Sequence, residues 1–386
     1  MQNDDQSSDR LLRVCYFGTY RENYSRSQIL LAGLYGRPDV QVQECHSQLW
    51  LGIEDRVEQA GGGWRRPRFW GRVISAYWRL FRLHNQMPEY DVMLIGYPGQ
   101  FDSYLARLLT WRRRKPMALD ILMSLHLVAQ ERGLTQKSPW TGRLIYSLEK
   151  GGLKLPDLLI SENDAYEGYY CQQYGLDPQG FRQVPHGADD RVFYPREVER
   201  CDRPFRVTYH GMYLPSHGMD TIITAAILLK DQDDIQFHFF GDGPERSRLL
   251  QIAAAEALDN VVFHGFVDRD ELLDSIARSH ISLGVFGTTR QSHYTIQNKI
   301  WEGLAMARPV VSGDSAVVRE SLVHGEHIYL VPRDDPQALA NAVEELKHNP
   351  RMREKIARAG YERFLSGNSI PAIGAATEQA LRTLLS

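Results

Sequence analysis

Short apolar runs alternate with longer amphipathic stretches along most of this chain of 386 residues. The first half predicts strands rich in Val, Ile, Leu and Phe and bounded by turn residues, as is typical of parallel strands buried on both faces. A helix is predicted over 27–35, and helical stretches follow the later strands. This alternation indicates crossover helices and a parallel sheet. The predicted strands are 11–18, 40–45, 90–96, 117–121 and 157–161.

The same pattern restarts in the second half, with helices predicted over 218–230 and 245–257. Between the two series, 185–204 carries three prolines, many charges and no apolar periodicity, which indicates a linker. The strands predicted in the second half are 205–210, 235–240, 261–263, 280–285, 309–312 and 327–331.

Two domains follow from this pattern, over 10–184 and 205–367. The polar, acidic segment 1–9 is predicted to be disordered. Helix-forming residues fill 336–386, with a break at Gly367-Asn368-Ser369.

The bulk composition narrows the class of protein. A hydrophobic fraction of 43%, a charged fraction of 24% and a net charge of −3 fit an ordinary globular protein rather than one covered in nucleic-acid-binding surface. No apolar run approaches the ~18 residues of a membrane-spanning helix, and the start lacks a signal-peptide pattern. The four cysteines are far apart and form no CxxC pair, so we expect ordinary thiols, a reducing compartment and a cytoplasmic protein.

Glycines follow several predicted strands, where open parallel sheets bind their ligands. Gly18 follows the first strand, either as a tight turn or to let a ligand approach the backbone. No GxGxxG series is complete, which disfavours a nicotinamide cofactor. Gly211 and Gly218 bracket a strand-to-helix loop whose amides and helix dipole suit a diphosphate. Gly241 and Gly243 form a plain turn or the wall of a nucleoside pocket.

Two side chains in these regions have both a functional and an ordinary interpretation. His217 is a surface histidine or a donor to a phosphate oxygen. Glu302 is a solvated helix residue or the carboxylate that grips both ribose hydroxyls of a nucleotide.

Taken together, several segments resemble glycosyltransferase family 4, the retaining group with the GT-B fold. The chain is similar to that family in order and spacing over nearly its whole length, and the run from Glu302 to Val311 is the most specific match. The other segments are Tyr16–Tyr20 with Arg26 and Gly33-Leu34, Val184–Asp189 with Phe193 and Pro195, Gly211–Gly218, Phe240–Pro244, Val262–Val267 and Lys299–Val311.

The resemblance implies an α/β fold of two facing Rossmann-like, doubly wound parallel-sheet domains with a cleft between them. It also implies that the last helix, about 368–386, packs back on the first domain. Glu302 would hold the donor ribose, the backbone at Gly303 and Leu304 would lie near the diphosphate, and Phe266 with Val267 would line the base pocket.

The remaining roles also come from the resemblance. Met212, Asn298 and Lys299 join the glycine loops in the donor-site set. On the first domain, Gly18 would approach the diphosphate or donor sugar. Asp120 and Ser124 would face the cleft as catalytic residues, and His126 competes with them for the place of the family's cleft histidine or is a helix-surface residue.

This sequence departs from the family pattern at three positions. Met212 and His217 stand where the family often has an arginine and a lysine that neutralise phosphates, in what resembles a subgroup with a His-Gly loop. Lys299, Arg21 or Arg26 would then supply the charge. Tyr294 replaces the first of two glutamates, the one that usually contacts the transferred sugar.

The implied activity is retaining transfer of a sugar from a UDP- or GDP-sugar to a glycan, lipid-linked or small-molecule acceptor. It would need no metal and no cofactor beyond the nucleotide-sugar co-substrate, since dipoles and cations stabilise the leaving diphosphate. A nucleotide-sugar epimerase of the same architecture and a non-catalytic nucleotide-binding assembly protein are the alternatives. Chain length disfavours a phosphorylase.

A basic, aromatic-rich stretch over 64–115 indicates a possible second partner. It holds eleven Lys and Arg against three acidic residues, a local excess of +8, interleaved with aromatic residues that include Trp64, Phe69, Trp70, Tyr77, Trp78, Phe81 and Trp111. Such segments lie on anionic membranes, which predicts peripheral contact with the inner face of the membrane. The other interpretation is a soluble arginine-rich face with aromatic residues in the core.

Overall fold

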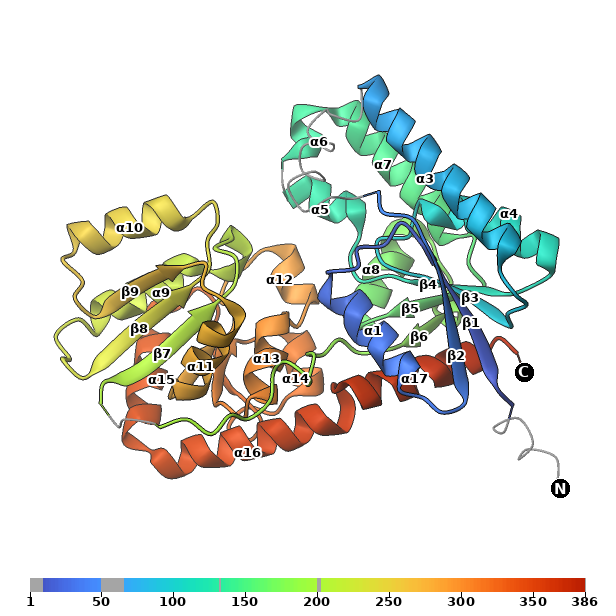
Figure 1. Ribbon diagram of the computed structural model, residues 1–386. Coiled ribbons are helices and arrows are strands. Elements are labelled where there is room, and N and C mark those ends of the chain that lie inside the picture. Colours follow the sequence, from blue (N-terminus) through green and yellow to red (C-terminus); the bar gives the residue numbers. More distant parts are fainter. Residues whose placement is uncertain (1–9, 50–65, 132, 200–202, 386) are drawn as a thin grey trace. The chain divides into compact units, whose positions relative to one another are not determined.

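The computed structural model describes residues 10–49, 66–131, 133–199 and 203–385 (Figure 1). The segment expected to be disordered, residues 64–65 of the basic stretch and residues 200–202 of the expected linker lie outside the described residues. Contacts divide the chain into two compact units. Unit 1 comprises Met1–His186 with Ile370–Ser386, and unit 2 comprises Gly187–Ser369.

Unit 1 is built on a six-stranded sheet in the order β2-β1-β3-β4-β5-β6, and every strand pairing is parallel. β3, β4 and β5 are buried at every residue, which explains why their sequences are apolar except for Asp120 and Ser161 at the ends of β4 and β5. The strands are β1 (Leu12–Gly18), β2 (Val40–His46), β3 (Val92–Ile95), β4 (Met117–Asp120), β5 (Leu158–Ser161) and β6 (Phe181–Gln183).

The helices of unit 1 include one from the far end of the chain. α17 packs against α1, where a Cβ added to Gly33 would lie 2.7 Å from the Gly374 Cα, so both glycines allow the close approach. The helices are α1 (Ser25–Tyr35), α3 (Pro67–Gln86), α4 (Asp102–Arg113), α5 (Leu125–Glu131), α6 (Leu134–Lys137), α7 (Pro139–Leu153), α8 (Asp164–Tyr174), the 3₁₀ turn η2 (Pro178–Gly180) and α17 (Ile370–Arg382).

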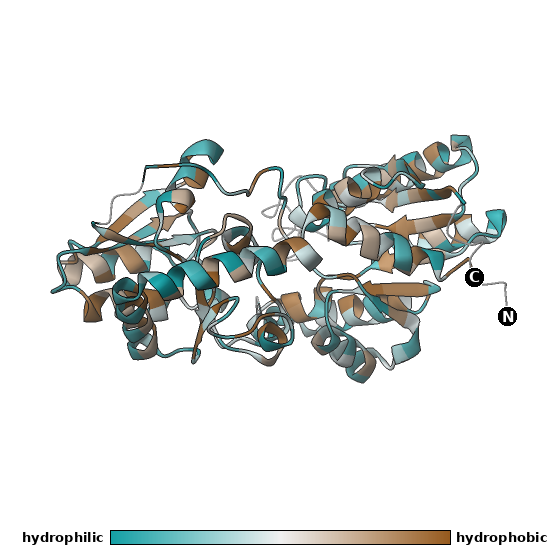
Figure 2. Cartoon of the chain, turned by 90° about the horizontal axis from the view of Figure 1, so that it is seen from below, coloured by the Kyte–Doolittle hydropathy of each residue, from teal (hydrophilic) through white to brown (hydrophobic). Residues whose placement is uncertain are grey.

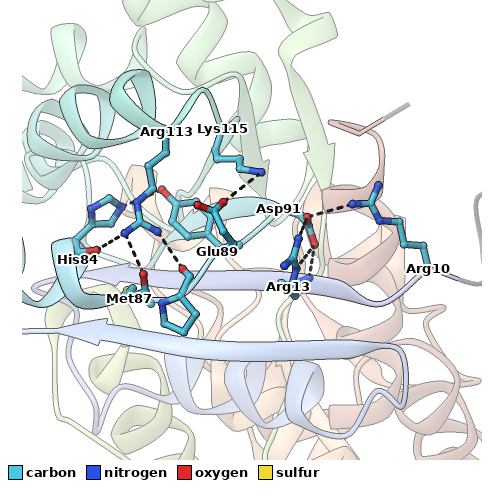
Figure 3. A network of polar contacts seen from close by, with 10 residues as sticks. Arg10, Arg13, His84, Met87, Glu89, Asp91, Arg113 and Lys115 are labelled. Carbon is cyan, nitrogen blue, oxygen red and sulfur yellow. Dashed lines mark hydrogen bonds and ion pairs between the residues drawn. The ribbon is translucent and has the colours of Figure 1, made fainter.

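Polar contacts join the end of α3 to α4 and fix the start of β3 in unit 1 (Figure 3). Arg113 donates to the carbonyls of His84 and Met87 at 2.7 and 3.0 Å, and so caps the α3 C-terminus. Asp91 accepts from the Arg13 guanidinium at 2.8 Å, and this ion pair lowers the pKa of the carboxyl.

Unit 2 contains a second six-stranded parallel sheet, in the order β12-β11-β10-β7-β8-β9. Several strands of both sheets appear brown in Figure 2, as their apolar sequences require. The predicted fold class, α/β with two doubly wound parallel sheets, is confirmed. The strands are β7 (Phe205–His210), β8 (Ile235–Phe240), β9 (Val261–Gly265), β10 (Ile281–Leu283), β11 (Val310–Gly313) and β12 (Tyr329–Val331).

The helices of unit 2 bury its sheet and share a core with it. Phe237, Ile222 and Val343 from β8, α9 and α15 are fully buried in one cluster. The helices are η3 (Pro215–His217), α9 (Met219–Leu228), α10 (Arg246–Ala255), α11 (Arg269–Arg278), α12 (Arg290–Tyr294), α13 (Asn298–Ala305), α14 (Ala316–Ser321), α15 (Pro336–His348) and α16 (Pro350–Gly367). Across the described ranges, none of the helices combines the length and apolar character that crossing a membrane requires.

Candidate functional site

The carboxyl ends of β7, β8 and β9 are joined by their backbones. Gly211 donates its N–H to the Phe240 carbonyl at 2.9 Å, and Gly241 donates to the Gly265 carbonyl at 2.7 Å. Gly241 has φ +117°, and a Cβ there would lie 2.2 Å from the Gly211 carbonyl oxygen. Only glycine allows these two loops to lie so close together.

The other end of the β7 loop is equally tight. Gly218 has φ +69°, and a Cβ there would lie 2.4 Å from the backbone nitrogen of Gly287. Phe286 donates its N–H to the His217 carbonyl at 2.9 Å, which ties the loop after β10 to the start of α9. A Cβ at Gly243 would lie 2.6 Å from the backbone of Tyr213. The glycines of the expected phosphate loop and nucleoside wall therefore share one compact loop cluster.

Lys299 brings a buried amine beneath this cluster from the first turn of α13. Its side chain is 5% exposed, and its Nζ donates to the Tyr209 hydroxyl at 2.9 Å. The ammonium also lies 4.3 Å from the centre of the Tyr209 ring, and its Nζ and Cε lie 3.4 Å from where a Cβ on Gly211 would be. Burial lowers the pKa of the Lys299 amine to about 7, although the nearby Glu302 opposes that shift.

His217 lies beside Lys299, with its Nδ1 3.1 Å from Nζ and 2.7 Å from the Met212 carbonyl oxygen. Because a carbonyl only accepts, the Nδ1 carries the hydrogen in this arrangement. Burial, and then the Lys299 charge, hold the pKa of the imidazole well below its usual value. The side chain of Met212 itself is exposed.

Glu302 lies one turn after Lys299 on the same helix and is held by a histidine. His210, the last residue of β7, places its Nε2 2.8 Å from Glu302 Oε2. The His210 side chain is 5% exposed and that of Glu302 is 17% exposed. The carboxylate thus lies at the carboxyl end of β7, beside the glycine loops, with part of its surface open to solvent.

Two of the predicted donor residues lie elsewhere on α13. Leu304 is fully buried, and a Cβ on Gly303 would lie 2.8 Å from the Val310 side chain, so this part of the helix packs against the sheet. The amides of mid-helix residues are used within the helix, whereas the free ones belong to its first turn. Gly303 and Leu304 are such mid-helix residues, whereas Asn298 and Lys299 lie in the first turn of α13.

Phe266 follows Gly265, the acceptor of the Gly241 hydrogen bond, and is 75% exposed. Val267 is half-buried beside it. An exposed aromatic ring at this edge of the sheet is free to stack on a planar ligand.

The Gly18 loop of unit 1 is organised by an aspartate that sequence reasoning did not select. Asp102, at the start of α4, accepts from the Thr19 backbone at 2.6 Å and from the Tyr77 hydroxyl at 2.8 Å. Gly18 has φ +132°, and a Cβ there would lie 2.6 Å from Asp102 Oδ2. Burial raises the pKa of the Asp102 carboxyl.

Asp120 lies at the end of β4 in an internal ion pair. It is fully buried, and Arg26 donates to its Oδ1 at 2.8 Å through Nη2 and at 3.1 Å through Nε. Arg26 also donates to the Pro185 carbonyl at 2.7 Å. The charge of Arg26 is therefore balanced within unit 1.

Ser124 and His126 belong to a network around a second missed carboxylate, Glu149 of α7. Glu149 is fully buried and accepts from Ser124 Oγ at 3.0 Å and from the amides of Leu125 and His126 at 2.8 and 2.9 Å. Burial raises the pKa of the Glu149 carboxyl and lowers that of the half-buried His126. Within the described part of the chain, the Nδ1 of His126 is buried without a hydrogen-bond partner.

The predicted residues thus fall into two groups, each described within its own unit. In unit 2, the glycine loops, His217, Lys299 and Glu302 come together, whereas Gly303 and Leu304 do not join them. In unit 1, Gly18 has Asp102 beside it, Asp120 pairs with Arg26, and Ser124 and His126 contact Glu149.

A family model described as glycosyl transferases group 1 matches residues 204–349, the part of the chain that holds this loop cluster and Glu302. We call residues 204–349, which are similar to that family, the group 1 domain.

Curated relatives extend the likeness beyond the group 1 domain. The chain is 32% identical to alpha-D-kanosaminyltransferase of Streptomyces kanamyceticus over 40% of its own length and 39% of that protein. It is 26% identical to the putative glycosyltransferase EpsD of Bacillus subtilis over 77% of both chains. It is also 26% identical to D-rhamnosyltransferase WbpZ of Pseudomonas aeruginosa, over 72% of this chain and 69% of that one.

Solved structures share the fold over nearly the entire chain. HepE of Anabaena, determined in complex with UDP, superposes with a TM-score of 0.68 over 97% of this chain and 100% of its own, at 15% identity. Sucrose-phosphate synthase of Thermosynechococcus elongatus gives a TM-score of 0.68 at 17% identity, over 97% and 99% of the two chains. The group 1 domain thus belongs to a chain with the GT-B fold.

Proposed function

We propose that this chain is a retaining glycosyltransferase that moves a sugar from a UDP- or GDP-sugar to a glycan, a lipid-linked or a small-molecule acceptor. One observation carries the proposal. In the group 1 domain, a buried lysine and a histidine-held glutamate lie together at the glycine loops that end β7 and β8. A diphosphate needs cations and amides, and a ribose needs a carboxylate acceptor, and this cluster offers both.

UDP is the nucleotide that we favour. HepE was solved with UDP and with UDP-glucose, and it shares the fold along nearly all of this chain. Glu302 would accept from the ribose hydroxyls, and the base would stack on Phe266. Asn298 and Lys299 would face the diphosphate from the start of α13, where the helix dipole favours negative charge.

Lys299 would supply the cation that the glycine loop lacks. Its Nζ lies 3.1 Å from His217 Nδ1, so the amine reaches from α13 to the position where the family usually has a loop lysine. This would make Met212 and His217 a variant of the usual site rather than a loss of it.

The proposed reaction occurs on one face of the donor sugar. The bond between the anomeric carbon and the diphosphate oxygen breaks, the acceptor oxygen bonds to that carbon from the same side, and the acceptor proton passes to the leaving diphosphate. The protein's part is electrostatic, because Lys299 and the α13 amides stabilise the charge that develops on the diphosphate. For this reason we propose that the reaction needs no metal. We also propose that it needs no cofactor beyond the nucleotide-sugar.

The acceptor would meet a membrane-facing surface on unit 1, which we call the basic-aromatic face and define by α3, α4 and α7. α3 contacts α4, and α4 contacts α7 (Figure 1). Their large exposed apolar residues include Trp70, Ile74 and Trp78 on α3, Leu108 and Trp111 on α4, and Trp140 on α7.

The charge of this face is positive. The acidic residues of the three helices are Asp102 and Glu149, which are 1% and 0% exposed, whereas Arg79 and Arg82 lie on the surface. Exposed tryptophans beside arginines suit the interface of an anionic bilayer. This supports peripheral binding to the cytoplasmic face of a membrane.

Co-sedimentation tests the basic-aromatic face. We expect binding to vesicles that contain phosphatidylglycerol, but not to pure phosphatidylcholine, and loss of binding in the double variant Arg79→Glu/Arg82→Glu. Arg358→Glu, which changes an exposed arginine of α16, is the matched control and should bind normally. Equal binding by all three proteins, or none by the wild type at low salt, would reject the membrane partner.

The enzyme activity has its own test. A thermal-shift screen with UDP, GDP and their sugars should reveal selective stabilisation by one nucleotide. Incubation with the matching donor and candidate acceptors should then yield a glycosylated product. Donor converted to another nucleotide-sugar without any acceptor would indicate an epimerase, and tight binding without turnover would indicate an assembly protein.

A further inference from the structure

His210 and Glu302 form a contact between the last residue of β7 and the middle of α13. Their atoms Nε2 and Oε2 lie 2.8 Å apart, although the residues are 92 positions apart in the sequence. The histidine is almost completely buried, whereas the carboxylate is partly exposed. The contact therefore ties a solvent-facing acid to a fixed point on the sheet.

The hydrogen in this contact belongs to the histidine. An ionised carboxylate accepts only, so His210 Nε2 donates to Glu302 Oε2. The other ring nitrogen, Nδ1, is buried and has no hydrogen-bond partner among the residues that the structure describes. A phenylalanine would fill the same space without a buried polar atom, so the histidine costs stability unless its Nε2 hydrogen bond is needed.

The bond occupies one oxygen of Glu302 and leaves the other to accept from elsewhere. It also fixes the side-chain rotamer, since a free glutamate on a helix surface samples several. A carboxylate that must accept from two neighbouring hydroxyls benefits from being fixed before the ligand arrives.

We propose that His210 is a positioning residue that fixes Glu302 for recognition of the ribose hydroxyls of the bound nucleotide. The proposal rests on the proposed function, because it assumes that Glu302 meets the ribose. It adds that the preference for ribose over deoxyribose depends on a residue that does not itself touch the nucleotide.

The experiment measures dissociation constants for UDP, 2′-deoxy-UDP and 3′-deoxy-UDP by calorimetry. We expect the wild type to prefer UDP by about 10-fold or more, as loss of a hydrogen bond to a charged group implies. His210→Phe should reduce that preference towards one, with little change for the deoxynucleotides. His210→Gln should restore it, because the glutamine amide places an N–H near the position of Nε2.

The ratio of constants is the decisive readout, since a general loss of folded protein changes all three constants together. His238→Phe is the matched control, because His238 is a half-buried histidine of the neighbouring strand that bonds His264 and not Glu302. It should keep the wild-type preference.

Two results overturn the proposal in distinguishable ways. If Glu302→Ala abolishes the ribose preference and His210→Phe retains it, the positioning role is wrong while the proposed function stands. If the wild type does not prefer UDP over its deoxy forms, the ribose role of Glu302 fails and the positioning role fails with it. If His210→Phe does not fold, the test depends on His210→Gln. That variant must keep the preference for UDP over its deoxy forms, and its loss would overturn the proposal.

Discussion

At the scale of single residues, Lys299 beneath the glycine loops should couple nucleotide binding to the uptake of a proton. The Lys299 pKa of about 7 lies far below the ordinary value of a lysine, because burial disfavours its charged form. In the unfolded chain this amine keeps its proton up to about pH 10.4. Between these values the unfolded state holds more protons, so the contribution of this group to stability rises with pH.

An anionic diphosphate should reverse that deprotonation. We expect UDP binding at pH 8 to take up close to one proton and to weaken by up to about 10-fold per pH unit above 7. Calorimetry in two buffers of different protonation enthalpy measures the uptake.

The matched variant is Lys299→Arg, whose guanidinium stays charged. If it folds normally, its UDP affinity should not change with pH between 7 and 9. If the wild type takes up no proton on binding UDP, the phosphate role of the lysine is contradicted. It is also contradicted if Lys299→Arg takes up as much proton as the wild type.

The sequence singled out some site residues and could not single out their partners. Glu302 and Lys299 were identifiable because they lie in one specific local run. His210 contacts Glu302, 92 positions away, and Asp102 contacts Thr19, 83 positions away. A local sequence pattern cannot indicate contacts between residues so far apart in the chain. In the sequence, nothing distinguishes Glu149 from an ordinary helix residue, because its contacts with the α5 amides form only on folding.

At the scale of elements, glycines decide how closely the loops approach. Gly241→Ala should destabilise the protein by about 2 kcal/mol or more, since it adds a clash with Gly211 to an unfavourable φ. Gly265 has φ +70°, but a Cβ added there would meet open space. We therefore expect Gly265→Ala to lower the free energy of unfolding by about 1–2 kcal/mol, through backbone strain alone. Urea denaturation compares the two, and equal losses would show that the loop contact is unimportant.

The Gly18 loop depends on α4 in a similar way. Asp102→Ala removes the acceptor of the Thr19 amide and the Tyr77 hydroxyl, and we expect a loss of about 2–4 kcal/mol in stability. Tyr77→Phe removes one of these bonds and should cost about 1 kcal/mol. If both variants unfold at the wild-type denaturant concentration, Asp102 does not organise the loop.

Most elements could be predicted because parallel strands buried on both faces leave uninterrupted apolar runs. β6 was missed because it is three residues long and its middle and last residues are exposed. Element ends also shifted: the strand predicted at 280–285 is Ile281–Leu283, since the residues after it turn to form the loop against Gly218.

For the whole molecule, two parallel sheets could be predicted from the alternation of strands and helices alone. The return of the chain from unit 2 to unit 1 could not be derived from spacing, because it depends on how Gly374 fits against Gly33.

The proposed chemistry for the whole enzyme uses no metal. We expect exhaustive dialysis against EDTA to leave the turnover of the nucleotide-sugar donor within about twofold of its starting value, because Lys299 and the α13 amides carry the stabilising charge. A large loss that added Mg²⁺ or Mn²⁺ restores would show that a metal replaces them.

The most direct test of the account is a calorimetric titration of UDP into the wild type and Glu302→Ala, with intact folding of both checked by circular dichroism. We predict that the variant binds about 10²-fold more weakly, as expected when hydrogen bonds from two hydroxyls to a carboxylate are lost. Equal affinity in the two folded proteins would contradict the placement of the nucleotide ribose at Glu302.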